Sequence, residues 1–164
     1  MACGVSPILK HIPGHGRATV DSHYDLPEIS ASYAQLQAHD FIPFTDLSRK
    51  PWGQGVWAMT AHVLYKSIDP QRAGSLSPLI INDVIRSDIG FDGVLIADDV
   101  SMKALKGDMS DLACRTLAAG CDLTLICNQD FDARRAVLQA VPFLTDDSAQ
   151  RLKRAEETRR AHIV

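Results

Sequence analysis

The sequence lacks the features that mark several large classes of protein. Its apolar runs fall well short of the roughly 18 residues that a membrane span needs. A formal net charge of −3 gives no basic surface for nucleic acid. The N-terminal stretch has neither a basic leader nor a long apolar core, so we expect no secretory signal and a cytoplasmic protein. The length of 164 residues is that of one ordinary domain.

Patterns typical of metal sites and disulfides are also scarce. No CxxC pair occurs among the four cysteines, and neither HxH nor HExxH is present. These absences weaken the case for a metal site. We interpret the cysteines as buried, reduced thiols of a cytosolic protein; they are Cys3, Cys114, Cys121 and Cys127.

Four short apolar runs are typical of buried parallel strands, because their hydrophobicity is continuous rather than alternating. They cover residues 6–11, 56–63, 93–99 and 123–128. Helical patterns follow them at 28–44, 76–90, 110–120 and 131–144, and the charged tail at 146–164 predicts a further helix with a solvated outer face. The alternation of strand and helix predicts an α/β fold, either an open doubly wound sheet or part of a (β/α)8 barrel.

Polar side chains close all four predicted strands. They are Lys10, His11, Thr60, His62, Asp98, Asp99, Cys127 and Asn128. The carboxyl ends of parallel strands form the ligand-binding edge in both architectures, so we expect these groups to share a site. Neighbouring strand residues point to opposite faces. We therefore keep Asp98 as the site residue and expect Asp99 to cap a helix that begins at SMKAL.

The segment 10–23, KHIPGHGRATVDSH, holds three of the six histidines on a glycine-containing loop that can move. Asp21 and His23 are two residues apart, so in an extended segment the carboxylate can hold the imidazole, as in hydrolytic dyads. One mechanism that fits is covalent catalysis by Asp98 with a histidine as general acid/base. The other is metal-assisted hydrolysis. Its ligands would come from His11, His15, His23, His62 and Asp98.

Three stretches, KHIPGHGRATVDSH, MTAHVLY and GFDGVLIADDVSMKAL, together resemble the bacterial β-N-acetylglucosaminidases of glycoside hydrolase family 3. The resemblance implies a retaining enzyme of cytoplasmic peptidoglycan recycling that uses no metal or other cofactor. It would remove terminal N-acetylglucosamine from muropeptides that end in 1,6-anhydro-N-acetylmuramic acid. The resemblance also implies roles for single residues. Asp98 would be the nucleophile, His23 with Asp21 the general acid/base, and Lys10 and His11 the sugar-binding pair, with His62 as a further substrate-binding candidate.

The resemblance also implies a (β/α)8 barrel, which takes about 250 residues when complete. The motifs match the second half of the family domain. We therefore expect residues 1–164 to form one partial domain, the C-terminal half of the barrel, with four βα units (strands five to eight) and 10–23 as its mobile catalytic loop. An open half-barrel leaves two strand edges uncovered. We expect a separate N-terminal half-barrel or a second copy to cover them, and activity to depend on that partner. The alternatives are a non-catalytic sugar-binding or scaffold half-barrel and a metal-dependent hydrolase.

Overall fold

The computed structural model describes residues 5–161 and contains a four-stranded sheet in which all neighbouring strands are parallel. The strand order is β1–β3–β5–β6. The strands are β1 (Ile8–Ile12), β3 (Trp57–Thr60), β5 (Val94–Asp99) and β6 (Leu123–Leu125). The predicted α/β fold with a parallel sheet is confirmed, although each strand is shorter than the apolar run that predicted it.

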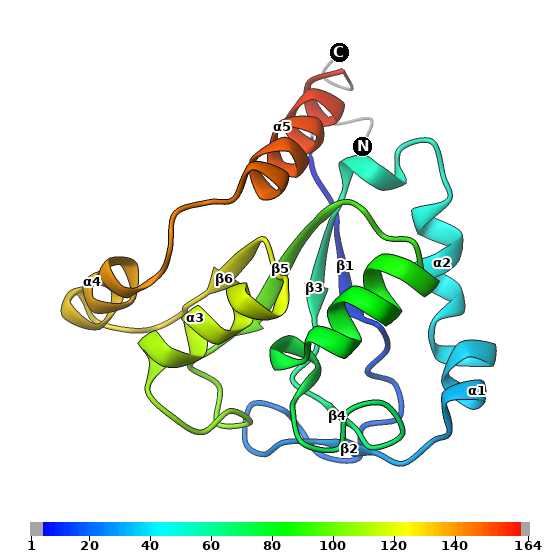
Figure 1. The fold of residues 1–164 in the computed structure, drawn as a ribbon, viewed down its shortest axis with the longest axis horizontal. Helices are drawn as coiled ribbons and strands as arrows, with labels where there is room; N and C mark the ends of the chain where they lie inside the picture. Colours follow the sequence, from blue (N-terminus) through cyan, green and yellow to red (C-terminus); the bar gives the residue numbers. More distant parts are fainter. Residues whose placement is uncertain (1–4, 162–164) are drawn as a thin grey trace.

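Helical segments alternate with these strands, and η4 and α3 lie in front of the sheet in Figure 1. In chain order the helical segments are α1 (Tyr33–Gln35), η1 (Leu36–Asp40), α2 (Ile42–Ser48), η2 (Gly53–Gly55), η3 (Gly74–Leu76), η4 (Leu79–Asp88), α3 (Met109–Ala119), α4 (Phe131–Ala140) and α5 (Asp146–Arg160). Apolar side chains from helices and strands meet in one main core, which includes Leu36, Ile80, Ile85 and Leu95.

The prediction of a single helix over 28–44 was wrong. Residues 28 and 29 form β2 (Glu28–Ile29), which pairs in parallel with β4 (Leu64–Tyr65) in a second, two-stranded sheet. The helix begins only after Ser32, whose backbone N–H donates to Gln35 Oε1 at 2.9 Å while Gln35 N–H donates to Ser32 Oγ. A strand of two residues is too short to leave a periodic signal in the sequence.

The later helices follow their predicted boundaries more closely. η4 and α3 end near the glycines that were expected to stop them, and Gly120 adopts a φ of 114°, which favours glycine. α3 nevertheless begins at Met109, because the Asp108 side chain accepts from the N–H groups of the next turn. α4 stops at Ala140, two residues before Pro142.

The helix of the charged tail forms, and residues such as Lys153 and Glu157 give it the predicted solvated face, but its other face packs on the sheet, which was not predicted. α5 lies at the end of the sheet where β1 begins (Figure 1). Arg151 and Arg154 donate to Asp92 at 3.0 and 2.7 Å, and Ser148 and Ala155 are buried. The helix is therefore bound to the sheet by ion pairs as well as by packing.

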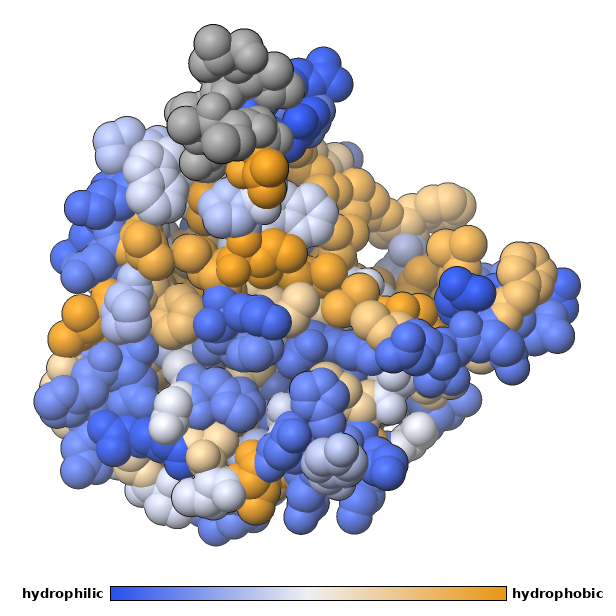
Figure 2. Space-filling view, turned by 180° about the vertical axis from the view of Figure 1, so that it is seen from behind, coloured by the Kyte–Doolittle hydropathy of each residue, from blue (hydrophilic) through white to orange (hydrophobic). Residues whose placement is uncertain are grey.

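The main sheet is open at both edges, since within residues 5–161 both β1 and β6 pair on one side only. Apolar side chains gather across the middle of the molecule when it is seen from behind (Figure 2). Val5 and Ile8 are exposed at the β1 side, as are Leu138 and Phe143 after β6. A cavity of about 700 Å³ lies between α3, α4 and residues 141–145.

The cysteines differ in burial. Cys121 is buried, whereas Cys114 and Cys127 are only half-buried, and all three are free thiols. The interpretation as buried thiols is therefore right for Cys121 alone, and Cys3 lies outside the described residues. Among the helices of residues 5–161, none combines the length and the apolar character needed to cross a membrane.

Candidate active site

The carboxyl ends of β1 and β5 bring together two of the side chains that the sequence singled out. His11 Nε2 of β1 lies 3.5 Å from Asp98 Oδ2 of β5. Their side chains are 27% and 14% exposed, so both are shielded but accessible. Lys10, His11 and His15 also line a cavity of about 450 Å³ beside β1. This edge of the sheet therefore offers a carboxylate, an imidazole and an ammonium group to a ligand.

The two oxygens of Asp98 have different surroundings. Oδ1 accepts a hydrogen bond from the backbone N–H of Asp99 at 2.9 Å, while Oδ2 faces the imidazole of His11. Burial lowers the pKa of His11, an effect that Asp98 opposes and that His15, with its ring centroid 5.4 Å away, reinforces. His11 is therefore held as a neutral ring that can donate or accept a hydrogen bond.

Asp99 holds together two loops at the same edge. Its carboxylate accepts from Ser101 N at 3.0 Å, from Ser101 Oγ at 2.8 Å and from Cys127 N at 3.1 Å. The expected helix over 101–105 does not form, so the prediction that Asp99 caps a helix was wrong. Asp99 instead ties the turn after β5 to the end of β6.

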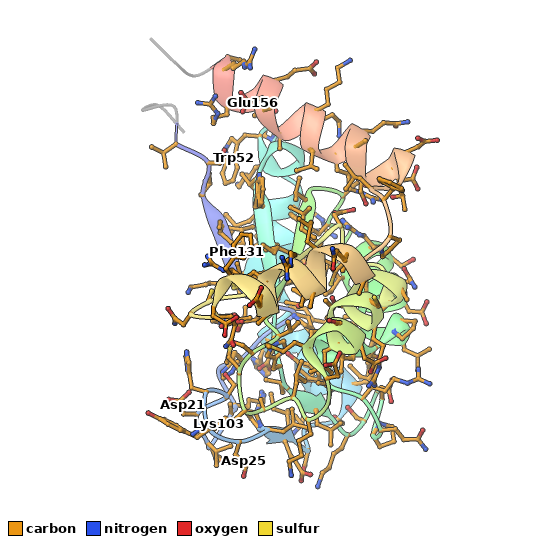
Figure 3. All side chains as sticks on the ribbon, turned by 90° about the vertical axis from the view of Figure 1, so that its left-hand side faces the viewer. Asp21, Asp25, Trp52, Lys103, Phe131 and Glu156 are labelled. Carbon is orange, nitrogen blue, oxygen red and sulfur yellow. The ribbon has the colours of Figure 1, made fainter. Side chains whose placement is uncertain are left out.

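The loop of residues 13–27 is anchored at both ends. Tyr65 donates its hydroxyl to Gly14 O at 2.7 Å, and Leu64 N–H donates to Pro27 O at 2.8 Å. Close to its C-terminal end, Lys103 Nζ of the loop after β5 lies 5.6 Å from the centroid of the Tyr24 ring. Figure 3 shows Asp21, Asp25 and Lys103 at one end of the molecule and Trp52 and Glu156 at the other. The loops after β1 and β5 therefore adjoin at the carboxyl end of the sheet.

The predicted pair of Asp21 and His23 forms on the exposed part of this loop. Asp21 Oδ1 lies 2.8 Å from His23 Nδ1 and accepts from the backbone N–H of His23 at 2.9 Å. These hydrogen bonds lower the pKa of Asp21. Because an ionised carboxylate can only accept, Nδ1 carries the proton and Nε2 is left for another partner. The side chains of His23 and Asp21 are 71% and 58% exposed.

His62 follows β3 at the same edge but lies beneath the surface. It is fully buried, with Nδ1 2.7 Å from Ser75 Oγ and Nε2 3.0 Å from Asp99 O. Both ring nitrogens are thus engaged within the chain. Ser75 was not predicted from the sequence, because a serine in a one-turn helix thirteen residues after the histidine fits no spacing rule.

The residues suggested as metal ligands do not form a common cluster. Over residues 5–161, no group of three or more histidine, cysteine, aspartate or glutamate side chains is arranged to hold a metal ion. His11 and Asp98 are neighbours, and His15 adjoins His11, but His62 is turned to Ser75 and Asp99.

The chain is similar to a family of enzymes over nearly its whole length. The model of the glycosyl hydrolase family 3 N terminal domain matches residues 2–157. The "Beta-hexosaminidase" of Idiomarina loihiensis is 40% identical over 147 residues, which cover 88% of this chain and 43% of that protein. That of Chromobacterium violaceum is 38% identical over 163 residues, which cover 98% of this chain and 43% of the relative. The chain thus spans less than half the length of these curated relatives.

Two solved structures match the fold. A glycoside hydrolase family 3 β-N-acetylglucosaminidase from Paenibacillus sp. str. FPU-7 aligns with a TM-score of 0.82 and 30% identity over 98% of this chain and 32% of its own. NagZ from Neisseria gonorrhoeae, in complex with N-trifluoroacetyl-D-glucosamine, aligns with a TM-score of 0.78 and 33% identity over 96% of this chain and 46% of its own. The family match and these relatives together show that the chain belongs to glycosyl hydrolase family 3, among the β-hexosaminidases.

Proposed function

We propose that the chain carries the hydrolytic groups of a retaining exo-β-N-acetylglucosaminidase. Its substrates would be muropeptides that end in 1,6-anhydro-N-acetylmuramic acid, from which it removes terminal N-acetylglucosamine during cytoplasmic cell-wall recycling. One observation carries the proposal: Asp98 lies beside His11 at the edge of the sheet that also bears the loop of Asp21 and His23. The glucosamine derivative bound by the NagZ relative supports the choice of sugar.

Asp98 is the nucleophile in this proposal. Its Oδ1 is occupied by the backbone N–H of Asp99, whereas Oδ2 is available at the shielded but accessible edge. Oδ2 attacks the anomeric carbon of the sugar while the bond from that carbon to the glycosidic oxygen breaks. The product of this first step is a covalent glycosyl-enzyme, as in other retaining glycosidases.

His23 transfers the proton in both steps. Asp21 holds Nδ1–H, so that protonated Nε2 donates its proton to the departing glycosidic oxygen. In the second step, neutral Nε2 takes a proton from the water that attacks the anomeric carbon, and Asp98 leaves as a carboxylate. Because His23 is exposed on a loop anchored at both ends, movement of the intervening segment brings it to the substrate.

Lys10 and His11 bind the sugar that is transferred. Lys10 is exposed beside the cavity at β1 and can donate to sugar hydroxyls, while neutral His11 can donate or accept. His62 does not suit direct substrate contact, because its ring is buried and both nitrogens already have partners.

In the whole domain, the four strands would be strands five to eight of a (β/α)8 barrel, with 10–23 as a mobile catalytic loop. The open edges of β1 and β6 support a partner that continues the sheet, either a separate N-terminal half-barrel or a second copy. The exposed apolar side chains at both sides support this as well, among them Ile8 and Leu138.

The test is release of a chromogenic aglycone from an N-acetyl-β-glucosaminide, with the Asp98→Asn variant as control. We expect Asp98→Asn to lower turnover by about 10³-fold or more. His23→Ala should slow cleavage of an unactivated disaccharide by about 10²–10⁴-fold and spare substrates with good leaving groups. An equal loss on both kinds of substrate would contradict the acid/base role.

The same assay is repeated with the N-terminal half of the Chromobacterium relative added in excess. No Asp98-dependent release under either condition would contradict the proposed function. Binding of N-acetylglucosamine without such release would favour a non-catalytic sugar-binding module.

A further inference from the structure

A buried series of hydrogen bonds begins at the imidazole of His62. Its Nε2 lies 3.0 Å from the backbone carbonyl of Asp99, and its Nδ1 lies 2.7 Å from Ser75 Oγ. A carbonyl can only accept, so Nε2 must carry the proton. Nδ1 of the neutral ring then accepts from the Ser75 hydroxyl. The two partners therefore select one tautomer of a ring that water does not reach.

The backbone of the residues before and after His62 holds Ser75 in place. Ser75 N–H donates to Ala61 O at 3.2 Å, and Gly74 N–H donates to Val63 O at 2.8 Å. A Cβ at Gly74 would come within 3.1 Å of Ala61 O, so the turn approaches the strand end as closely as glycine permits. The histidine and the serine are thus positioned by one rigid unit.

At its other end the series reaches Asp98. The backbone carbonyl of Asp99 accepts from His62, and the backbone N–H of the same residue donates to Asp98 Oδ1 at 2.9 Å. The Asp99 side chain adds bonds to Ser101 and Cys127. The orientation of Asp98 therefore depends on a backbone that is fixed from several directions.

We infer that His62 and Ser75 are positioning residues for Asp98, acting through the backbone of Asp99. The catalytic meaning of this inference rests on the proposed function. The titratable groups around the ring are Asp98 and Asp99 on β5, His11 on β1 and His15 on the loop after β1. Burial lowers the pKa of His62 and outweighs the two aspartates, which raise it. The ring therefore stays neutral and leaves proton transfer to His23.

Two substitutions of His62 separate its two hydrogen bonds. In His62→Gln the amide N–H group lies near the position of Nε2 and can still donate to Asp99 O. In His62→Asn the shorter side chain reaches only the position of Nδ1, so the donor to Asp99 is lost. We expect the amide hydrogen of Asp99 to exchange about tenfold faster in His62→Asn than in His62→Gln. We also expect ¹⁵N NMR of the unaltered chain to show a neutral His62 ring with the proton on Nε2.

Equal exchange of the Asp99 amide in both variants, or a doubly protonated His62 ring at neutral pH, would overturn the inference. If either variant of the buried histidine fails to fold, Ser75→Ala decides, with faster Asp99 exchange expected and unchanged exchange counting against the inference. None of these measurements requires turnover. A chain without glycosidase activity would contradict the proposed function, but the hydrogen bonds of His62 could still be tested in it. Where turnover is measurable, His62→Asn should lower kcat more than His62→Gln does, with little change in KM.

Discussion

The two ends of the main sheet surround their carboxylates in different ways. At the amino end, the Asp122 side chain is 1% exposed and all of its hydrogen-bonding capacity is directed to the protein. Its four donors are Arg86 Nη2, Arg151 Nη1, Ser148 Oγ and Leu95 N, at 2.7 to 3.0 Å. This carboxylate joins η4, α5 and β5 and has nothing left to offer a ligand.

The Asp98 carboxylate at the carboxyl end has far fewer hydrogen-bond partners among the described residues. Among residues 5–161 it accepts one hydrogen bond, from Asp99 N, and its second oxygen lies 3.5 Å from His11. A shielded carboxylate with an unused oxygen is expected where a ligand completes the set of partners. The buried ion pairs lie at the amino end, and the proposed catalytic groups lie at the carboxyl end, which is the division seen in (β/α)8 barrels.

Removing one charge at each end of the sheet should have the largest effect. Asp122→Asn should lower the free energy of unfolding by about 3–5 kcal/mol, because it leaves Arg86 and Arg151 without their shared buried partner. Asp98→Asn should leave unfolding nearly unchanged and abolish hydrolysis. Urea unfolding of the two variants beside the parent measures the difference. Equal destabilisation by both substitutions would mean that Asp98 is also a structural group.

A second matched pair tests packing at the two ends. A Cβ at Gly55, near the amino end, would collide with Thr158 of α5, whereas a Cβ at Gly16 in the loop would meet nothing within 4 Å. Gly55→Ala should therefore cost about 1–3 kcal/mol of unfolding free energy, and Gly16→Ala should cost almost none. Thermal unfolding measures both. A loop variant as unstable as Gly55→Ala would show that the loop is packed as tightly as the amino end.

The sequence predicted the carboxyl end better than the amino end. Strand-end placement was enough to expect Asp98 near His11, and a spacing of two residues was enough to pair Asp21 with His23. The bonds of Asp122 join segments 26 to 36 residues apart. Neither a strand-end pattern nor a helical period points to such bonds, and for the same reason Ser75 was missed and the docked face of α5 was not predicted. Contacts between strand ends, such as that of Asp98 with His11, follow from the parallel order of the strands, whereas ion pairs from helices to the sheet, such as that of Arg151 with Asp122, appear only once the chain is folded.

Association offers a third test, because a partner that covers the open edges would make stability a property of the assembly. Leu138 on α4 is 76% exposed, and Leu79 on η4 is 45% exposed. Leu138→Glu should weaken association by about tenfold because a buried charge replaces apolar contact. Leu79→Glu is the control of the same chemistry at a different site. Sedimentation over a range of concentrations, with and without an added N-terminal half, measures the effect. A chain that stays monomeric in both series, or two variants that behave alike, would contradict a role for the β6 side in association.

The smallest expected effect on stability belongs to Asp21. The hydrogen bonds from His23 lower the pKa of Asp21 below its ordinary value of about 3.9. The pair therefore contributes fully above that value and loses its contribution only as the pH falls through the lower, folded value. Since both side chains are largely exposed, Asp21→Asn should not shift the urea midpoint measurably between about pH 5 and 8.

Hydrolysis of an unactivated disaccharide should nevertheless fall over the same pH range, because the asparagine no longer holds Nδ1 of His23 as a charged acceptor. NMR titration of the Asp21 carboxyl group provides the check on the cause: His23→Ala should raise its pKa only part of the way to the ordinary value, because alanine keeps the backbone N–H and removes only the imidazole. A lowered urea midpoint in Asp21→Asn would group Asp21 with Asp122 as a structural residue. A loss of hydrolysis at constant stability would instead show that the Asp21 carboxylate serves proton transfer, in contrast to the Asp122 carboxylate, which holds the sheet to its helices.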